Sequence, residues 1–357
     1  MFDDLVPKKP PYATMTMDEV RAIEATSGIV VASTFSGCGG TCLGWRMAGA
    51  DVRYALEYVP EARETYLANH PHVHMDARDI RDVKGSEVLA ACGVDDLDVF
   101  EGSPPCASFS ASGKRDKLWG VEKSYSTGKN QRTDDLVDEW VRVGLEIRPK
   151  VMVMENVAGL GTGAALTTHL HSAISTMTDA GYVVDARLLR GMDYGVPQVR
   201  GRLFIIAFRG DLGLAPRWPS AVGFVYTLRD ALSLAGVSPP EELAAVDSAR
   251  FAIAAEWAKL SHGESSLKYF NLVRPDPDEP CPTVTATHAS PWAASVTHPD
   301  ACRKFTPTEL RPIFGVPRDF VLRGSVEQQS ERLGRCVAPP VAKALAGEII
   351  KLLKRRP

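Results

Sequence analysis

A cysteine, a glutamate and two arginines are the residues of this chain best suited to covalent chemistry on a polar substrate. Cys106 follows two prolines in the segment 102–106. Prolines restrict the backbone, and a rigidly held thiol attacks at lower orientational cost, more so where cations favour the thiolate. Glu155 can hold or donate a proton near neutral pH in a partly dry cleft. Arg200 and Arg202 share a face in extended backbone, where they suit a carbonyl or a phosphate.

A glycine-rich turn, Phe35-Ser-Gly-Cys-Gly-Gly40, stands where a predicted strand meets a predicted helix. Glycines let a ligand approach the backbone at the carboxyl end of a strand, where open α/β sheets bind ligands. Glu57 ends the next strand, at the place where an acidic residue takes a pair of ribose hydroxyls. Asp79 follows the next helix and could accept from an adenine amino group. The alternative is a tight structural turn with solvated acids, so this pattern alone leaves a nucleoside cofactor open.

The segment 111–132 follows the cysteine and is locally basic. It holds six basic residues and two acidic ones, an excess of +4 in a chain of net charge −3, with three glycines among them. A basic loop with glycines beside a nucleophile is typical of a lid that grips phosphates. An inert buried cysteine beside a solvated charged loop is the other interpretation.

Alternating strands and helices must position these residues. Short β-branched runs predict strands at 28–34, 52–56, 97–100, 151–154, 182–188 and 203–208. Helices are predicted at 40–48, at 60–69, and from a cap at Asp134 to about residue 147. This order favours an open parallel sheet of the doubly wound α/β class. Cys106 and Glu155 would then lie at the same edge of the sheet.

The character of the chain changes after residue 208. Residues 209–303 are rich in Pro, Ser and Ala, with weak periodicity and many loop signals. From Phe305 the pattern regains order and ends in an apolar helix over 341–353 that we expect to return to the first domain. We therefore predict a large domain made of 1–208 and 304–357, with a small irregular domain over 209–303.

Composition excludes several protein classes. Of 357 residues, 45% are hydrophobic and 24% charged, as in globular proteins, and no apolar run reaches the about 20 residues that a membrane span needs. The first residues lack the apolar segment of a secretory signal. Seven scattered cysteines without metal-ligand spacing favour reduced thiols, so we expect a cytoplasmic protein that binds no metal and no membrane.

Taken together, these motifs resemble those of the DNA cytosine-5 methyltransferase family, in family order over nearly the whole chain. Phe35–Gly40 resembles the cofactor motif, Pro104-Pro-Cys106 the nucleophile motif, and Glu155-Asn-Val157 the proton-donor motif. Gln198-Val-Arg-Gly-Arg202 resembles the arginine motif. Further matches are Pro282-Thr-Val-Thr285 at the close of the family's target recognition region, then Thr308-Glu-Leu-Arg311 and Phe314-Gly-Val-Pro317. Several short motifs in the right order are far more specific than any one of them.

The resemblance implies a Rossmann-like domain that binds S-adenosylmethionine (SAM) and a target recognition domain that reads double-stranded DNA. Cys106 would add to C6 of a flipped cytosine, Glu155 would protonate N3, and Arg202 would hold the O2 carbonyl, with Arg200 nearby. Phe35 would stack on adenine, Glu57 would bind the ribose and Asp79 the adenine edge. The other cofactor contacts implied are Ser36, Gly37, Gly39, Gly40, Tyr58, Ile80, Pro104, Arg335 and Val337. The substrate contacts implied are Ser110, Lys114, Arg115, Gln198, Thr283 and Thr285.

One position departs from the family pattern. The last motif reads Gly334-Arg-Cys-Val-Ala-Pro339, with Arg335 where the family has asparagine. In one interpretation Arg335 turns outward or pairs with an acid such as Glu331, and the enzyme transfers a methyl group. In the other, Arg335 engages a carboxylate on a carboxylated SAM analogue, and a carboxymethyl group is transferred.

Two further functions are compatible with the sequence. The same chemistry on tRNA is one, and a catalytically silent nucleic-acid-binding subunit is another, which the presence of Cys106, Glu155 and Arg202 argues against. Association with the nucleoid follows from a DNA substrate, and a cognate restriction endonuclease is left open. His70, His72 and His74 alternate, but without a matching cluster we predict a surface loop and no metal site.

Overall fold

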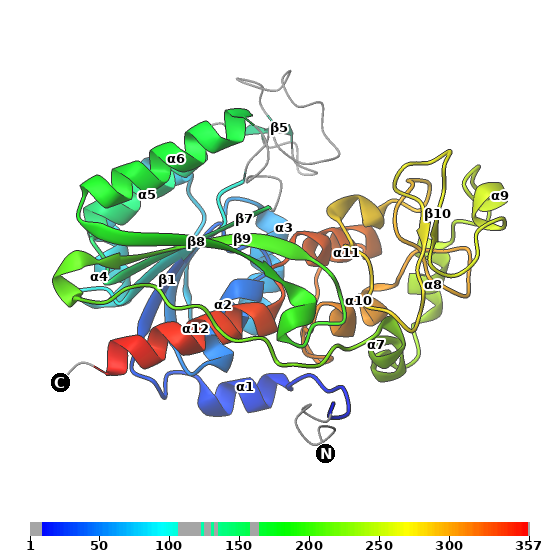
Figure 1. Cartoon of the computed structure of the whole chain (residues 1–357), viewed down its shortest axis with the longest axis horizontal. Helices are drawn as coiled ribbons and strands as arrows, with labels where there is room; N and C mark the ends of the chain where they lie inside the picture. The colour runs from blue at the N-terminus through cyan, green and yellow to red at the C-terminus, as the bar shows by residue number, and fades with distance from the viewer. Residues whose placement is uncertain (1–8, 106–122, 125–129, 132–134, 158–163, 356–357) are drawn as a thin grey trace, which may run out of the picture.

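A seven-stranded sheet forms the centre of the molecule (Figure 1). The computed structural model describes residues 9–105, 123–124, 130–131, 135–157 and 164–355. In spatial order the strands are β3 (His74–Asp76), β2 (Asp51–Leu56), β1 (Val30–Thr34), β4 (Val99–Gly102), β7 (Val151–Val157), β9 (Gly201–Arg209) and β8 (Tyr182–Arg190). The order reverses beside β1, which is the place where doubly wound sheets bind ligands.

The sheet is mixed, and the prediction of a parallel sheet was wrong for one strand. β3, β2, β1, β4 and β7 pair in parallel, but β9 is antiparallel to both β7 and β8. Between β8 and β9 stands only residue 191 to residue 200, with the short 3-10 helix η4 (Gly191–Tyr194). A parallel return needs a crossover of a dozen or more residues, so this short connection forces a hairpin-like reversal.

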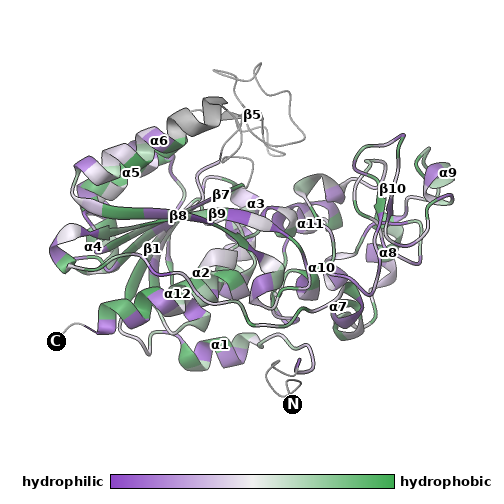
Figure 2. Ribbon diagram, in the orientation of Figure 1, coloured by the Kyte–Doolittle hydropathy of each residue, from purple (hydrophilic) through white to green (hydrophobic). Residues whose placement is uncertain are grey.

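Helices cover both faces of the sheet. On one face lie α4 (Gly85–Cys92), α5 (Leu136–Ile147) and α6 (Ala164–Asp179), and on the other lie α2 (Gly40–Met47) and α12 (Pro339–Lys354) (Figure 1). Figure 2 shows the central strands as mostly apolar ribbons between these layers. The predicted terminal helix is confirmed: α12 packs along α2 so closely that a Cβ on Gly44 would stand 2.4 Å from the Cβ of Ala342.

The start of α5 differs from the prediction. Asp134 lies outside the described residues, and the residue that precedes the helix is Asp135, whose side chain makes no capping hydrogen bond. Its carboxylate instead forms an ion pair with Arg81. The described residue at the helix start is therefore held by a long-range ion pair and not by a local cap.

The irregular region is built from short elements. They are η5 (Gly210–Leu212), α7 (Leu228–Ala235), α8 (Pro240–Val246), α9 (Ala254–Trp257), β10 (Glu264–Ser265), β11 (Val273–Arg274) and η6 (Ala286–Ala289). Leu212 and Trp218 still pack on the core of the sheet, whereas Ile253, Leu260 and Leu272 form a small core of their own. Figure 1 places β10 and α9 at the end of the molecule beyond α10 (Pro307–Ile313) and α11 (Val326–Arg335).

The remaining elements complete the frame. They are α1 (Met17–Ile23), α3 (Pro60–Asn69), the 3-10 helix η2 (Ile80–Asp82), β5 (Lys123–Ser124) and β6 (Asn130–Gln131). Thr16 and Glu19 form a capping box at the start of α1. Within the described ranges, no helix combines the length and the apolar character of a membrane span.

Candidate active site

The glycine turn after β1 adopts backbone that its residue types explain. Gly37 and Gly39 have φ of +56° and +93°, the left-handed region that glycine enters freely. Phe35 also has a positive φ, +53°, which is uncommon for an aromatic residue and marks a constrained position. A Cβ on Gly40 would stand 2.1 Å from the Sγ of Cys336, so glycine there lets α2 begin against the last motif of the chain.

Glu57 closes this turn from the neighbouring strand. Its Oε2 accepts a hydrogen bond from the Gly37 N–H at 2.8 Å, and its Oε1 accepts from the Val59 N–H at 2.7 Å. The carboxyl is buried, and burial raises its pKa. A Cβ on Gly37 would meet nothing within 4 Å, so open space lies beside this turn. Ser36 is buried at the same place, with its Oγ 2.8 Å from that of Ser33.

The third acidic residue predicted here lies just beyond β3. Asp79 accepts a hydrogen bond from the Arg81 N–H at 3.1 Å and forms an ion pair with the Arg81 guanidinium at 2.9 Å. Ile80 is buried, and Tyr58 is half-buried after Glu57. Because β1, β2 and β3 are parallel neighbours, their carboxyl ends bring Phe35, Glu57 and Asp79 to one edge of the sheet.

His70 was predicted to lie on the surface, and that prediction was wrong. Its ring is buried, and a Cβ on Gly39 would stand 2.5 Å from its Nε2. The Arg46 guanidinium lies 2.8 Å from Nδ1, and burial and this cation lower the pKa of His70, which keeps the ring neutral. The prediction holds for His72 and His74, which are exposed, and fails for His70 alone. His70 supports the glycine turn from beneath.

Glu101 is a buried acid that the sequence analysis did not single out. It lies on β4 opposite Ser33 of β1, and the thiol of Cys42 lies 3.8 Å from its Oε1. Burial, helped by the charge of Glu155, raises the pKa of Glu101 to about 8. Its position within an apolar strand run is the signal that could have found it.

Glu155 and Arg202 form the centre of the site. Arg202 of β9 stands opposite Val157 of β7, two residues from Glu155, so the two side chains lie on one face of the sheet. The Arg202 Nε is 3.1 Å from the Glu155 Oε1. Burial raises the pKa of Glu155, while Arg202 and Arg200 oppose that shift. The result is a carboxyl that can hold a proton nearer neutrality than an exposed glutamate.

Asn156 ties the glutamate strand to the segment that leads to the cysteine. Its Nδ2 donates to the Pro104 carbonyl at 3.1 Å, and the Ser103 N–H donates to the Thr34 carbonyl at 3.3 Å. Pro104 is buried between these contacts. Cys106, Ser110, Lys114 and Arg115 lie outside the described residues, as does the basic segment apart from two short strands.

Arg200 lies beside Arg202, but its guanidinium is bonded to backbone and is not a free cation. Its guanidinium donates to the Val284 carbonyl and to the Gly334 carbonyl, both at 2.9 Å, and lies over the Phe314 ring. Burial, with Arg202 nearby, lowers the pKa of Arg200 to about 9. The residue therefore joins three segments that are far apart in the sequence.

Gln198 has a similar part. It is buried, accepts from the Val284 N–H at 3.2 Å and donates to the Ile313 carbonyl at 3.4 Å. Thr283 is half-buried and Thr285 exposed on the same segment, and a Cβ on Gly334 would stand 2.6 Å from the Thr285 carbonyl oxygen. The structure thus brings the arginine motif, the segment 282–285 and the last motif together.

The sequence pattern of one family, "C-5 cytosine-specific DNA methylase", matches residues 29–232 and 250–351. The chain belongs to this family. It is similar to the type II methyltransferases M.XorII of Xanthomonas oryzae pv. oryzae, 29% identical over 90% of this chain and 85% of that protein, and M.DdeI of Desulfomicrobium norvegicum, 30% identical over 88% and 87%.

Solved structures show the same fold. A putative DNA modification methyltransferase from an Escherichia coli prophage has a TM-score of 0.71 at 22% identity, covering 92% of this chain and all of that one. The Dnmt2 methyltransferase of S. pombe has a TM-score of 0.66 at 18% identity, covering 91% and 98%. The predicted fold class is confirmed, and the methylase is a SAM-dependent DNA cytosine-5 methyltransferase.

The residues at the first edge of the sheet fit the methylase's cofactor. A nucleoside needs acceptors for hydroxyl and amino groups. Glu57 supplies a carboxylate beside the open space at Gly37, and Asp79 supplies another at the same edge of the sheet. Phe35 is half-buried and supplies a ring at the same edge. Val337 is buried against the start of α2.

Arg335 of the methylase turns to its own helix. Its Nε and Nη2 lie 2.9 and 2.7 Å from the Glu331 Oε1, and its side chain is 42% exposed. This is the arrangement that the outward-turning interpretation expects. The carboxylated analogue remains a prediction.

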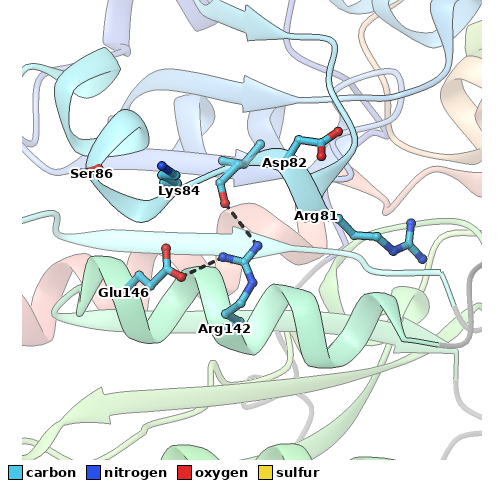
Figure 3. Close-up of a pocket in the computed structure, with 7 residues that line it drawn as sticks. Arg81, Asp82, Lys84, Ser86, Arg142 and Glu146 are labelled. Carbon is cyan, nitrogen blue, oxygen red and sulfur yellow. Dashed lines mark hydrogen bonds and ion pairs between the residues drawn. The ribbon is translucent and has the colours of Figure 1, made fainter.

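A pocket of about 610 Å³ lies outside the predicted cofactor site (Figure 3). Residues in and just after η2 line this pocket, among them Arg81 and Lys84, together with Arg142 and Glu146 of α5. Arg142 pairs with Glu146 at 2.8 Å and donates to the Val83 carbonyl, while Arg81 pairs with Asp79, so two of the cations are already neutralised. In the part of the chain that the structure describes, no cluster of three metal-ligating side chains is found.

Proposed function

We propose that this methylase modifies C5 of cytosine in double-stranded DNA through a covalent bond between the Cys106 sulfur and C6, with Glu155 as the proton donor. The observation that carries the proposal is the buried Glu155–Arg202 pair beside the Asn156–Pro104 hydrogen bond. These contacts link the strand that carries Glu155, whose pKa is raised, to Pro104. Pro104 stands two residues before Cys106, the cysteine of the nucleophile motif.

The chain's residues divide the reaction as follows. The Cys106 thiolate adds to C6 while Glu155 donates its proton to N3, which leaves C5 electron-rich. SAM supplies an electrophilic methyl group on a sulfonium. Loss of the C5 proton to a base and expulsion of the Cys106 thiolate then restore the aromatic ring, with N3 returning its proton to Glu155.

Arg202 has two tasks in this proposal. It keeps the Glu155 carboxyl oriented through the 3.1 Å contact, and it stabilises the O2 carbonyl of the base. Arg200 holds the surrounding backbone, since its guanidinium is already bonded to Val284 and Gly334. Arg202 would therefore contact the base, while Arg200 would position the backbone around it.

Residues 209–303 are proposed as the target recognition domain. Attack on C6 needs access from above the ring plane, so the cytosine must leave the stack and the recognition domain must hold the duplex. Support comes from the short elements and separate small core around Leu272. The basic segment 111–132 would close over the flipped base.

A DNA substrate implies that the methylase acts at the nucleoid in the cytoplasm. The type II names of its relatives suggest a restriction endonuclease as its companion.

The experiment is mass spectrometry of nucleosides from cells that express the chain, with Cys106→Ala as the control. We expect 5-methylcytosine in DNA from the wild type alone. A heavier, carboxyl-bearing cytosine would instead support the second interpretation of Arg335. Modified cytosine in tRNA but not in DNA, or no modified cytosine in either, would overturn the proposal.

A further inference from the structure

Two cysteines from opposite ends of the sequence lie together at the glycine turn. Cys38 belongs to the turn itself, and Cys336 follows α11 in the last motif. Both thiols are free and both residues are buried in the same cluster. A hydrogen bond joins the two side chains. The proposed reaction gives neither thiol a task.

The Cys336 sulfur is packed against the turn with no space to spare. A Cβ on Gly40 would stand 2.1 Å from this sulfur, so glycine is the residue that leaves room for it. The preceding residue, Gly39, is equally confined, since a Cβ there would stand 2.5 Å from the His70 Nε2. A shift of the Cys336 sulfur toward Cys38 therefore has to move the backbone of the turn.

The two thiols are chemically unequal. The hydrogen bond with Cys336 lowers the pKa of Cys38, and the Arg332 cation acts in the same direction, although burial opposes both. The Cys38 sulfur also lies 3.7 Å from the Arg332 carbonyl oxygen. The same hydrogen bond, together with burial, raises the pKa of Cys336. Because the thiolate is the reactive form of cysteine, Cys38 is the nucleophile of the pair and Cys336 the resolving thiol.

The other cysteines of the described ranges have a different character. Burial raises the pKa of Cys42, Cys92, Cys281 and Cys302. Thiols of this kind are inert packing residues. A thiol of lowered pKa beside a second thiol is instead the typical arrangement of a redox-sensitive pair.

We propose that Cys38 and Cys336 form a reversible disulfide in response to peroxide, and that this disulfide lowers the affinity of the methylase for SAM. The inference rests on the glycine turn as the SAM site, and it is independent of the chemistry assigned to Cys106.

The oxidation proceeds in two steps. The Cys38 thiolate attacks one oxygen of hydrogen peroxide, the O–O bond breaks, and hydroxide leaves, so the sulfur becomes a sulfenic acid. The Cys336 sulfur then attacks the Cys38 sulfur, the S–O bond breaks, and the hydroxyl leaves with the Cys336 proton as water. The two thiols have lost two electrons, and the peroxide has been reduced to two molecules of water. A dithiol reductant reverses the change by thiol–disulfide exchange.

The disulfide has to disturb the cofactor site. Bonded sulfurs are about 2.05 Å apart, which is much closer than two thiols in hydrogen-bond contact. Since Gly40 leaves no free space beside Cys336, the backbone of the turn moves when the bond closes. The open space beside Gly37 changes shape with it. A turn already filled by SAM would resist the same movement, so the cofactor and the disulfide exclude each other.

The test uses the full-length Cys106→Ala chain, so that oxidation of the proposed nucleophile cannot contribute. The reduced chain is treated with hydrogen peroxide, with and without saturating SAM. It is then alkylated and digested, and mass spectrometry identifies any peptide that links Cys38 to Cys336. Calorimetry measures SAM affinity in the reduced, oxidised and re-reduced chain. Because no methyl transfer is measured, the outcome does not depend on the proposed function.

Three further variants are made in the same chain. Cys336→Ala and Cys336→Ser remove the resolving thiol, and the serine keeps the approximate size of the side chain where alanine destabilises the fold. Cys281→Ala is the matched control, because this cysteine is also completely buried. Each variant is compared with itself before and after peroxide, and its melting temperature confirms that it is folded.

We expect peroxide to link Cys38 to Cys336 and to lower SAM affinity by about 10-fold or more, with full recovery after reduction. Saturating SAM should slow the linkage. In Cys336→Ala and Cys336→Ser, SAM affinity after peroxide should stay within about twofold of its reduced value, about 0.4 kcal/mol. Cys281→Ala should respond like its parent.

Three results would overturn the inference. The first is a folded chain in which peroxide produces no peptide that links the two cysteines. The second is complete linkage with unchanged SAM affinity. The third is an equal loss of SAM affinity in both Cys336 variants, which would assign the effect to another residue.

Discussion

The edge of the central sheet and the outer end of the region 209–303 differ in which side chains they bury and which they expose. At the sheet edge Glu57, Glu155 and Arg200 are buried and held by backbone or ion-pair contacts. At the outer end Leu267 and Phe270 lie in solvent. Chemistry requires charges that are oriented before the substrate arrives, whereas recognition of DNA requires groups left free for it. The two places therefore differ in the way that the proposed function requires.

The cores beneath these two places also differ. The sheet lies between two large clusters of buried side chains, while the outer end has a cluster of three buried residues, Ile253, Leu260 and Leu272. Free energies of local unfolding follow the apolar surface that each part buries. We therefore expect the sheet edge to stay ordered under conditions in which the outer end opens.

The largest expected effect belongs to the sheet edge. Glu155→Gln keeps the shape of the side chain but removes its proton, and a general acid contributes about 10²- to 10⁴-fold to rate. We expect kcat to fall by that factor, with duplex and SAM affinities close to wild type. Single-turnover methylation of plasmid DNA measures it.

Asp185→Asn is the matched control, because it is the same change of carboxylate to amide on β8, where the side chain is exposed. Full activity in Glu155→Gln would mean that this carboxyl does not donate the proton. If Glu155→Gln lowered the affinity for DNA by the same factor as the rate, the sheet edge would serve DNA binding as well as the chemical step. The contrast between the two regions would then be wrong.

The next effect tests the small core. Leu272→Ala removes a fully buried side chain, which costs about 2–5 kcal/mol where the surroundings cannot relax. We expect faster hydrogen exchange over 250–297 and weaker duplex binding, with SAM affinity unchanged. Leu243→Ala, at a leucine that is 37% exposed in the same region, should change neither. Equal destabilisation of β1 and β4 would show that the two regions unfold as one unit.

A pH effect sharpens the comparison from the catalytic side. The pKa of Glu101 is raised to about 8, so the folded chain keeps a proton that the unfolded chain has released above about pH 4.5. The contribution of Glu101 to the free energy of unfolding is then fully present below about pH 4.5. It falls by about 1.4 kcal/mol per pH unit until about pH 8. Glu101→Gln should remove this slope and be the more stable protein at pH 8. Denaturant unfolding at pH 6, 7 and 8 measures it, and parallel slopes for both proteins would contradict the buried proton.

The smallest effect is expected at Arg335. Its contact with Glu331 is an exposed pair four residues apart on a helix, worth about 0.3–0.5 kcal/mol. Arg335→Asn should leave the KM for SAM within about twofold and the transferred group unchanged. Competition between SAM and a carboxylated analogue, read by mass spectrometry of the product, is the check. A switch of preference would show that Arg335 faces the cofactor and not Glu331.

The strands of the sheet could be predicted from local patterns, because short β-branched runs are typical of buried strands. The predicted 28–34, 52–56 and 151–154 became β1, β2 and β7, and 60–69 became α3. What local patterns missed depends on distant partners. The antiparallel β9 follows from the shortness of its connection, and the burial of His70 follows from Arg46, 24 residues away in the chain.

The candidate site was predictable in part for the same reason. Glu155 and Arg202 were each singled out from their motifs, and the structure brings the two side chains into contact. The clamps made by Arg200 and Gln198 join segments about 80 to 130 residues apart, which no periodicity reveals. Glu101 and Asn156 were missed because their partners, Cys42 and Pro104, are about 50 to 60 residues away in the chain.

The close approach of Gly40 to Cys336 has a consequence for how the enzyme comes into being. The glycine turn after β1, the proposed cofactor site, is synthesised early, but the segment against which it rests is made roughly 300 residues later, after about 15 to 60 seconds of translation. Until the last motif leaves the ribosome, the early turn has Glu57 and His70 beside it but lacks the contact with Cys336. A truncated product of this gene would therefore lack a finished cofactor turn, and modification of the host's DNA would wait for a complete chain.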